Sequence, residues 1–276
     1  MKIRFTKMHG LGNDFVVIDA INQKVDLSAT QVQRLADRRF GVGCDQVLLI
    51  EVPTQPDVDF RYRIYNADGS EVENCGNGAR CFARFVRDRK LTGKSCIVVE
   101  TCNGILTLSV NPDESVTVNM GVPILEPTQI PFNAQQQNSV YSLALDDSQL
   151  EISAISMGNP HAVCVVENTQ TLDMEHFGPQ VESHLDFPQR VNAGFMQVLT
   201  RSEVNLRVYE RGAGETLACG TGACAAVVAG RLRNLLDSCV TVNLPGGSLN
   251  IEWAGEGQPV LMTGPAESVF HGQTRL

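Results

Sequence analysis

Two parts of this chain repeat one another: RIYN at residues 63–66 followed by CGNGA at 75–79, and RVYE at 207–210 followed by CGTGA at 219–223. The spacing is a constant 144 positions without a gap, and seven of the seventeen positions from 63 to 79 are identical to their partners. Internal repetition of this kind indicates two copies of one structural unit. Two units related by a pseudo-two-fold axis would direct equivalent residues into a shared cleft. We therefore expect Cys75 and Cys219 to approach one ligand from opposite sides.

Each repeat places a half-buried strand before its cysteine. Residues 59–65 and 203–209 alternate apolar and polar side chains, which is typical of a strand with one buried face. Residues 15–20 and 46–51 are also predicted to be strands. Short apolar runs with Asn, Gly and Pro breaks at 95–120 and 140–166 predict successive hairpins.

Helices are predicted after each cysteine, at residues 79–90 and 223–236, the second apolar on nearly every side. Residues 28–31 form a capping-box pattern that predicts a further helix, and Gly41 is placed to end it. We therefore expect an α+β protein with two pseudo-symmetric domains. Each would be a mixed, barrel-like β-sheet around a central helix, with the active site in the cleft between them.

A length of 276 residues is typical of two domains. The first is expected at 1–120, carrying Cys75 and joined by a C-terminal return segment at 265–276. The second is expected at 121–264, carrying Cys219, and the proline-rich residues 121–131 are the best linker candidate.

Composition excludes several classes of function. A net charge of −9 with scattered Lys and Arg argues against nucleic-acid binding. No apolar run approaches the ~20 residues of a membrane span, and residues 1–12 do not resemble a signal peptide, so we expect a cytoplasmic protein without a membrane partner. Nine cysteines, several in apolar runs, indicate buried thiols rather than a disulfide framework. Cys44 is interpreted as such a packing residue.

The cysteine loops suggest acid–base chemistry. Each cysteine stands at a strand-to-helix junction before Gly-x-Gly, where backbone N–H groups can surround a carboxylate. A helix N-terminus also favours a thiolate. For one such loop a plain turn is the simpler interpretation, but two loops in register favour a function.

An amino-acid α-carbon between the two sulfurs would lose its proton to one thiolate and receive another from the opposite thiol. This inverts the centre without a cofactor, and the sequence shows no signature for pyridoxal phosphate. Charge on the substrate carboxylate would be stabilised by N–H donors of Gly76, Asn77, Gly220 and Thr221, each worth about 2.7 to 4 kcal/mol.

Further blocks of sequence carry a resemblance to a known family. They are MHGLGNDF at 8–15, NADGSE at 66–71, SMGNPH at 156–161 and ERGAGET at 210–216. Together with the cysteine loops they resemble the diaminopimelate epimerase family along essentially the whole chain, within a wider fold group that includes proline racemases. The resemblance implies cofactor-independent epimerisation of LL-2,6-diaminopimelate to the meso form, a step of lysine and cell-wall precursor biosynthesis.

The resemblance also implies roles for individual residues. Cys75 and Cys219 would be the catalytic acid and base, and no metal is expected. The substrate site would be lined by Asn13, Gln46, Asn66, Asn159, Asn192, Glu210 and Arg211, in addition to the four loop residues named above. Arg211 would hold the distal carboxylate, while His161 and Glu210 would tune the protonation of the thiols.

The resemblance implies a homodimer with a contact at Phe270, where the family tends to place a tyrosine, and Phe270 lacks that hydroxyl. Thr221 stands where serine is common and keeps the backbone N–H.

Three alternatives remain. The first is an epimerase or racemase for another amino acid, which would not need Arg211. The second is structural zinc held by Cys75, Cys81, Cys219 and Cys224, whose spacing fits such sites poorly. The third is a redox switch that forms a disulfide between Cys75 and Cys219, for which reductant should restore an activity lost to oxidant.

Overall fold

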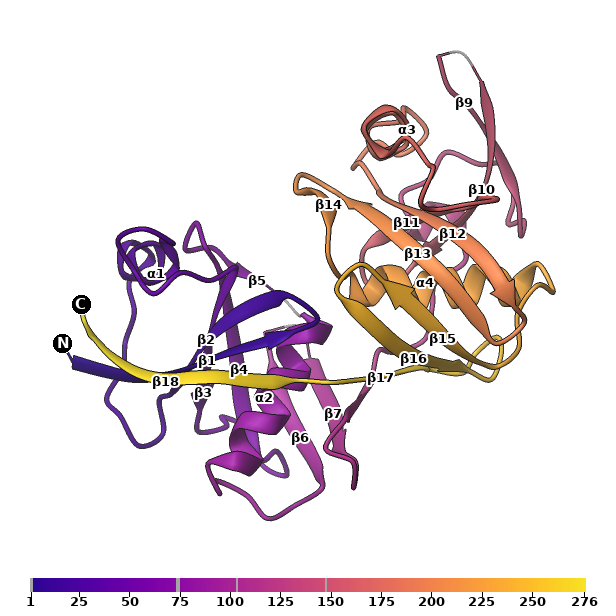
Figure 1. The fold of residues 1–276 in the computed structure, drawn as a ribbon. Coiled ribbons are helices and arrows are strands. Elements are labelled where there is room, and N and C mark those ends of the chain that lie inside the picture. Colours follow the sequence, from indigo (N-terminus) through magenta and orange to yellow (C-terminus); the bar gives the residue numbers. More distant parts are fainter. Residues whose placement is uncertain (1, 73–74, 103, 147) are drawn as a thin grey trace. The chain divides into compact units, whose positions relative to one another are not determined.

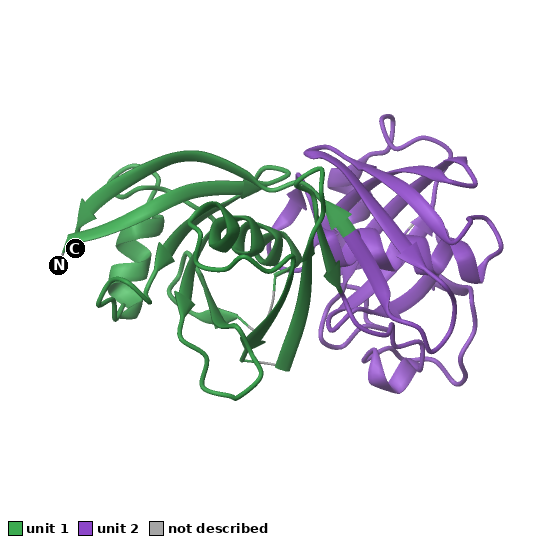
Figure 2. Ribbon diagram, turned by 90° about the horizontal axis from the view of Figure 1, so that it is seen from below, with its two compact units in different colours: residues 1–119, 263–276 green, residues 120–262 purple. Residues whose placement is uncertain are grey.

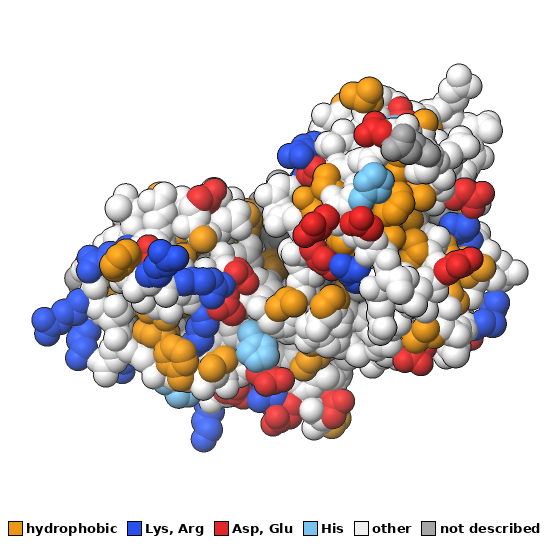
Figure 3. Space-filling model, turned by 45° about the horizontal axis from the view of Figure 1, so that its top comes forward, with side chains coloured by type: hydrophobic (Ala, Val, Ile, Leu, Met, Phe, Trp, Pro, Cys, Tyr) orange, Lys and Arg blue, Asp and Glu red, His pale blue; other side chains and the backbone are white. Residues whose placement is uncertain are grey.

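The computed structural model describes residues 2–72, 75–102, 104–146 and 148–276, and it divides into two compact units. Unit 1 contains residues 1–119 and 263–276, and unit 2 contains residues 120–262 (Figure 2). No helix within the described residues is long and apolar enough to span a membrane. Acidic and basic side chains lie intermixed on both units in the view of Figure 3.

Unit 1 is a sheet with two helices (Figure 1). Its strands are β1 (Lys2–Gly10), β2 (Asn13–Asp19), β3 (Gln46–Glu51), β4 (Phe60–Asn66), β5 (Glu71–Val72), β6 (Cys96–Thr101), β7 (Gly104–Val110), β8 (Val116–Asn119) and β18 (Glu267–Arg275). Its helices are α1 (Ala29–Ala36) and α2 (Gly76–Asp88).

Unit 2 has a corresponding set of elements. Its strands are β9 (Tyr141–Ala144), β10 (Gln149–Ser156), β11 (Pro160–Val165), β12 (Asn192–Thr200), β13 (Glu203–Glu210), β14 (Gly214–Thr216), β15 (Cys239–Leu244) and β16 (Gly247–Trp253), while β17 (Val260–Gly264) crosses the boundary. Its helices are η1 (Pro127–Gln129), α3 (Met174–Glu182) and α4 (Gly220–Leu232).

The strand pairing confirms that the chain contains two copies of one unit. In unit 1, β1 pairs antiparallel with β18 and β2, β2 pairs parallel with β3, and β3 pairs antiparallel with β4. Then β4 pairs antiparallel with β5 and parallel with β6, which pairs antiparallel with β7. The strands β9 to β16 repeat this pattern, including the parallel pairs β11–β12 and β13–β15. Each unit is therefore a mixed sheet of the same connectivity.

The helix that follows each cysteine is the centre of its unit. Helix α2 contacts β1, β2, β7 and β8, and α4 contacts β10, β11, β12 and β16. Every residue of α4 from Gly222 to Gly230 is buried, which confirms the prediction of a helix enclosed by sheet. Strands provide apolar side chains on that inner face at every second residue. The second helices cover the outer faces, where α1 packs on β3 and α3 on β12 and β13.

The local predictions are largely confirmed, with errors at helix ends. Helices α2 and α4 begin three residues earlier than predicted, at Gly76 and Gly220, because a glycine is a weak helix signal but fits the first turn here. The capping box at Ser28 is present, with Gln31 as its partner. The prediction that Gly41 ends this helix is wrong, since α1 ends at Ala36 with Asp37 as its C-cap.

Candidate active site

Both cysteines occupy the N-cap position of the central helix in their unit. Cys75 precedes α2 with φ −146° and ψ 114°, and Cys219 precedes α4 with φ −117° and ψ 105°. Their carbonyl groups accept the first helical hydrogen bonds, from Ala79 at 2.8 Å and from Ala223 at 3.0 Å. The amides of the first helical turn lack partners within their helix and can therefore donate to an anion beside the thiol.

The second glycine of each loop allows close packing beneath the thiol. A Cβ atom at Gly78 would lie 2.5 Å from Tyr62 Oη, and the hydroxyl of Tyr62 donates to the carbonyl of Cys75 at 3.3 Å. A Cβ at Gly222 would lie 3.1 Å from Val208 Cγ2 and 3.2 Å from Cys219 Sγ. In both units, a glycine brings the helix start close to the neighbouring strand.

The strand register extends the repeat to three further pairs of predicted site residues. Gln46 lies opposite Phe15 on β2 and Asn192 lies opposite His161 on β11, so Gln46 and Asn192 are equivalent. Asn13 and Asn159 precede Phe15 and His161 by two residues and are therefore equivalent as well.

Asn66 and Glu210 form the third such pair. Asn66 pairs with Gln46 on the neighbouring strand, and Tyr65 and Tyr209 pair with Val47 and Ala193. The same register in both units therefore aligns Asn66 with Glu210.

The asparagine pair carries a sequence signal that the cysteine repeat did not include. Each asparagine follows a glycine, Gly12 with φ 87° and Gly158 with φ 91°, a conformation that glycine adopts readily. The Gly-Asn dipeptides stand 146 positions apart, two more than the cysteines. A gap-free comparison therefore does not detect them.

In unit 1 the structure connects Asn13 with Cys75 and Asn77. Cys75 Sγ lies 3.7 Å from Asn13 Oδ1 and donates to it, and Asn77 Nδ2 donates to the same oxygen at 3.3 Å. Gln46 Nε2 donates to Asn66 Oδ1 at 3.0 Å, and Asn66 Nδ2 donates to Ser70 Oγ at 3.2 Å.

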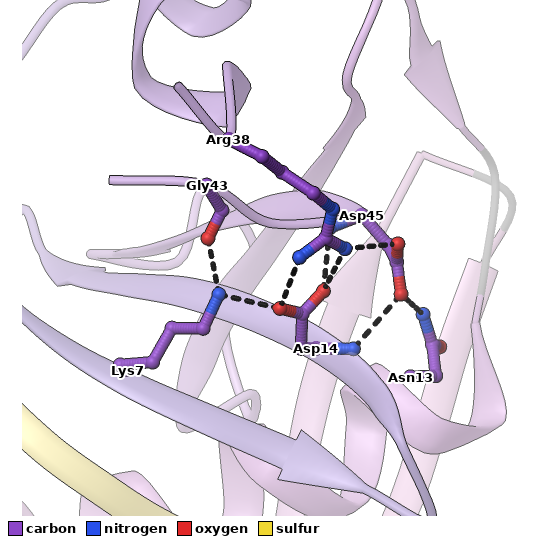
Figure 4. Close-up of polar contacts among 6 residues, drawn as sticks. All are labelled: Lys7, Asn13, Asp14, Arg38, Gly43 and Asp45. Carbon is purple, nitrogen blue, oxygen red and sulfur yellow. Dashed lines mark hydrogen bonds and ion pairs between the residues drawn. The ribbon is translucent and has the colours of Figure 1, made fainter. Parts of the chain in front are cut away.

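A charged network supports the strand that begins at Asn13 (Figure 4). Arg38 donates to both carboxylate oxygens of Asp14, at 3.0 and 2.7 Å, and to Asp45 Oδ1 at 2.7 Å. Lys7 adds a bond to Asp14 at 2.5 Å. The pKa of Asp14 is lowered well below its usual range, because hydrogen bonds from Arg38 and Lys7 outweigh the effect of burial.

In unit 2 a chain of hydrogen bonds runs from His161 to Cys219. His161 Nε2 lies 3.0 Å from Asn159 Oδ1, and Asn159 Nδ2 donates to Thr221 Oγ1 at 3.3 Å. Thr221 Oγ1 lies 3.6 Å from Cys219 Sγ. Because Thr221 accepts from Asn159, its hydroxyl proton is available to the sulfur.

His161 is a neutral imidazole in this chain. Burial, together with the nearby charge of Arg211, lowers the pKa of His161 to about 3. Since Asn159 Oδ1 only accepts, the ring proton resides on Nε2. His161 Nδ1 is a buried acceptor with no partner among the described residues.

Burial and the carboxylate of Glu210 both raise the pKa of the Cys219 thiol. Burial raises the pKa of Cys219 well above its usual value, the charge of Glu210 raises it further, and a hydrogen bond from Thr221 opposes both. Thr216 Oγ1 donates to Glu210 Oε1 at 2.6 Å. Glu210 therefore bears on the protonation of Cys219.

Arg211 is held at its backbone and is an exposed residue. Its N–H donates to Asn192 Oδ1 at 2.8 Å, and Asn192 Nδ2 donates to the carbonyl of Pro160 at 3.2 Å. Among the described residues its side chain makes one bond, from Nη1 to the carbonyl of Gln189 at 3.2 Å. The guanidinium has donors left for a carboxylate ligand.

The other cysteines named in the sequence are packing residues. Cys44 lies in the core between α1 and the sheet, and burial raises its pKa to about 11. Cys81 and Cys224 are fully buried in α2 and α4. Within the described ranges, no group of three or more His, Cys, Asp or Glu side chains is placed to hold a metal ion.

Solved structures with this fold include a PhzF-family phenazine biosynthesis protein from Bacillus anthracis, with a TM-score of 0.70, 18% identity and full coverage of both chains. They also include a hydroxyproline epimerase from Agrobacterium vitis with bound trans-4-hydroxy-L-proline, with a TM-score of 0.70 and 12% identity. That match covers 99% of this chain and 92% of the other. At these identities the likeness shows the fold, which is the expected two-domain, barrel-like α+β class.

The sequence comparisons identify a narrower group. Residues 5–126 and 153–269 match the family described as diaminopimelate epimerase. The diaminopimelate epimerase of Teredinibacter turnerae is 64% identical over 276 residues, covering all of both chains. That of Thioalkalivibrio sulfidiphilus is 63% identical over 274 residues, covering 99% of each. The chain therefore belongs to the diaminopimelate epimerase family of isomerases.

Proposed function

We propose that this protein epimerises LL-2,6-diaminopimelate to meso-diaminopimelate without a cofactor, with Cys75 and Cys219 as the two acid–base residues. The observation that carries the proposal is the repeat of one cysteine at the same helix N-cap in two units of equal connectivity. Family membership supports the substrate. The reaction belongs to lysine and cell-wall precursor biosynthesis.

In this mechanism the α-carbon of the substrate lies between the two sulfurs. One thiolate takes the α-proton, so that a C–H bond breaks and an S–H bond forms. The opposite thiol then gives its proton to the other face of the carbanion and becomes the thiolate. No electrons are exchanged, and the reverse reaction uses the same two groups with their roles swapped.

The amides at the two helix starts would stabilise the negative charge that develops on the substrate carboxylate. They belong to Gly76, Asn77, Gly220 and Thr221, and preorganised donors of this kind are worth about 2.7 to 4 kcal/mol each. The helix dipoles add only ~0.3 to 2 kcal/mol. Fixed N–H groups are therefore the larger contribution.

Recognition of the distal amino-acid group would come from Arg211 and the amide side chains. A guanidinium pairs with a carboxylate through two parallel hydrogen bonds, which fixes geometry as well as charge. The amides and carboxylate that would line the site are Asn13, Gln46, Asn66, Asn159, Asn192 and Glu210. His161 and Glu210 would tune the thiols from within unit 2.

We also propose that the protein is a cytoplasmic homodimer with Phe270 in the contact. Phe270 lies on β18 with 48% of its surface exposed and meets Phe5 edge-on, with ring centroids 5.9 Å apart. Phe5 is buried, so the exposed apolar surface here belongs to Phe270 and its neighbour Val269, and exposed apolar side chains that adjoin one another are typical of an association surface. Sedimentation of the wild type beside Phe270→Asp tests it, since the aspartate should give monomers.

Incubation of the reduced, cofactor-free protein with pure LL-diaminopimelate in D₂O tests the proposed activity. Conversion to the meso form, with one solvent deuteron at the α-carbon, is expected. L-Proline and trans-4-hydroxy-L-proline are the control substrates and should not react. Turnover of either control without turnover of diaminopimelate would reassign the substrate, and no exchange with any of the three would remove the two-thiol proposal.

A further inference from the structure

The equivalent asparagines of the two units face their cysteine loops with opposite ends of the amide. Asn13 presents Oδ1 to Cys75 Sγ and to Asn77 Nδ2. Asn159 instead presents Nδ2 to its loop, where it donates to Thr221 Oγ1 at 3.3 Å. One cysteine loop therefore faces a hydrogen-bond acceptor and the other faces a donor.

A different residue fixes the amide in each unit. Asn13 Nδ2 donates to Asp45 Oδ2 at 2.9 Å, and since a carboxylate only accepts, the amide of Asn13 has one orientation (Figure 4). Asn159 Oδ1 lies 3.0 Å from His161 Nε2, and the amide keeps the opposite orientation while His161 carries its ring proton on Nε2. By strand register, the position equivalent to Asp45 is Val191, and the position equivalent to His161 is Phe15. Each unit thus has one orienting group, and the two differ in polarity.

The carboxylate of Asp45 is itself held in place. Its Oδ2 also accepts from the backbone N–H of Asp14 at 3.0 Å, and its Oδ1 accepts from Arg38 at 2.7 Å. Arg38 is fixed in turn by both oxygens of Asp14. The carboxylate can therefore hold the amide of Asn13 even though 44% of the Asp45 side chain is exposed.

We propose that Asp45 is a positioning residue, which acts through Asn13 to favour the protonated form of the Cys75 thiol. An acceptor beside sulfur stabilises S–H, whereas a donor stabilises the thiolate. In the free protein this acceptor therefore raises the proton affinity of Cys75, whereas burial and the Glu210 charge raise that of Cys219. The inference rests on the proposed function for its meaning, because the proton affinity of Cys75 would set how readily that thiol takes or gives the α-proton.

Other titratable groups near Asp45 and Cys75 could also change the protonation of Cys75, and the test must exclude them. Lys7, Asp14 and Arg38 lie around Asp45, and the charge of Cys75 acts on Tyr62 and Cys81. The negative charge of Asp45 would also disfavour a thiolate directly, without Asn13. A test must therefore separate orientation of the amide from charge.

The test compares Asp45→Ala with Asp45→Asn by the rate at which iodoacetamide modifies Cys75, followed by mass spectrometry from pH 6 to 9. In Asp45→Ala the amide of Asn13 is released and can turn its donor toward sulfur, so alkylation should become about fivefold faster or more near pH 7. Asparagine at position 45 still offers an oxygen to Asn13, and its rate should stay within about twofold of the wild type. The exposed thiols of Cys96 and Cys239 are internal controls in the same digests. Their alkylation rates should be the same in the variants as in the wild type.

The double variant Asn13→Ala/Asp45→Ala should alkylate at the rate of Asn13→Ala, since Asp45 acts only through Asn13. Equal acceleration by Asp45→Asn and Asp45→Ala would assign the effect to charge and overturn the inference, as would an unchanged rate in Asp45→Ala. The measurement needs no substrate. A wild type that fails to convert diaminopimelate would therefore refute the proposed function, whereas a converting wild type with an unresponsive Asp45→Ala would refute the inference alone.

Discussion

Replacing Gly78 by alanine should loosen the start of α2 and displace Cys75. The added Cβ would lie 2.5 Å from Tyr62 Oη, about 1 Å inside a normal contact. Tyr62 is only 1% exposed and packs edge-on against Phe82, with centroids 5.2 Å apart, so its ring has little space to retreat. Overpacking of a core lowers stability by about 1 to 3 kcal/mol. The higher helix propensity of alanine offsets at most about 1 kcal/mol of that loss.

Hydrogen exchange of the amides in α2 is the suitable assay, because it reports this helix directly. A net loss of about 1 to 2 kcal/mol corresponds to roughly 5- to 30-fold faster exchange. Gly222→Ala is the matched control in the equivalent helix: its Cβ would meet Val208 Cγ2 at 3.1 Å, so exchange in α4 should change less.

Tyr62→Phe removes the atom that collides with the new Cβ. The Gly78→Ala penalty should therefore be smaller in a Tyr62→Phe background, although Tyr62→Phe alone loses the bond to the Cys75 carbonyl. Unchanged exchange in Gly78→Ala, or an equal penalty with and without the tyrosine hydroxyl, would refute this account of the second glycine.

Three further predictions concern the thiols and the groups around them. Cys75→Ala and Cys219→Ala should each lower kcat for epimerisation by about 10²-fold or more, since each removes one acid–base group, and a variant near the wild-type rate would exclude that cysteine from catalysis. Glu210→Gln should speed alkylation of Cys219, because burial and the Glu210 carboxylate both raise the pKa of that thiol; a slower reaction would contradict the sign of the charge effect. The pKa of His161 is lowered to about 3 by burial, so the unfolded chain binds a proton that the folded one does not as pH falls from about 6.5 toward 3. The free energy of unfolding should therefore decrease by up to about 1.4 kcal/mol for each pH unit of acidification in that range. Urea titrations at several pH values measure this dependence, and in His161→Gln it should be weaker by the contribution of one proton.

The sequence predicts the fold well where local and long-range signals agree. Alternating apolar residues identify β4 and β13, and Phe60, Tyr62 and Ile64 are buried as that pattern predicts. The repeat predicts the shared connectivity, because two similar sequences bury the same faces. Helix starts were less predictable, since glycine has a low helix propensity and Gly76 and Gly220 are nevertheless the first helical residues.

The residues of the candidate site could be proposed from the sequence, but the hydrogen bonds that connect them could not. The cysteines and their glycines follow from the repeat, and the asparagines, Glu210 and Arg211 follow from resemblance. The Asp45–Asn13 bond joins residues 32 positions apart in different segments, and no spacing rule connects them. Which end of an amide faces a thiol depends on a neighbour that only the folded chain supplies.

Which positions are identical in the two copies of the repeat, and which differ, agrees with the role that we propose for each position. Positions that would act through the backbone, such as Gly76 and Gly220, are the same in both units, as expected if the helix starts share the role of binding an anion. Positions that act through side chains differ: Asn77 corresponds to Thr221, Asn66 to Glu210, and Asp45 to Val191. A reaction that inverts one centre needs one proton donor and one acceptor at a time, and two identical halves would not prefer either arrangement. Under the proposed mechanism, divergence of the side chains around the duplicated thiol would supply the difference in proton affinity, while the retained backbone geometry would supply the anion site.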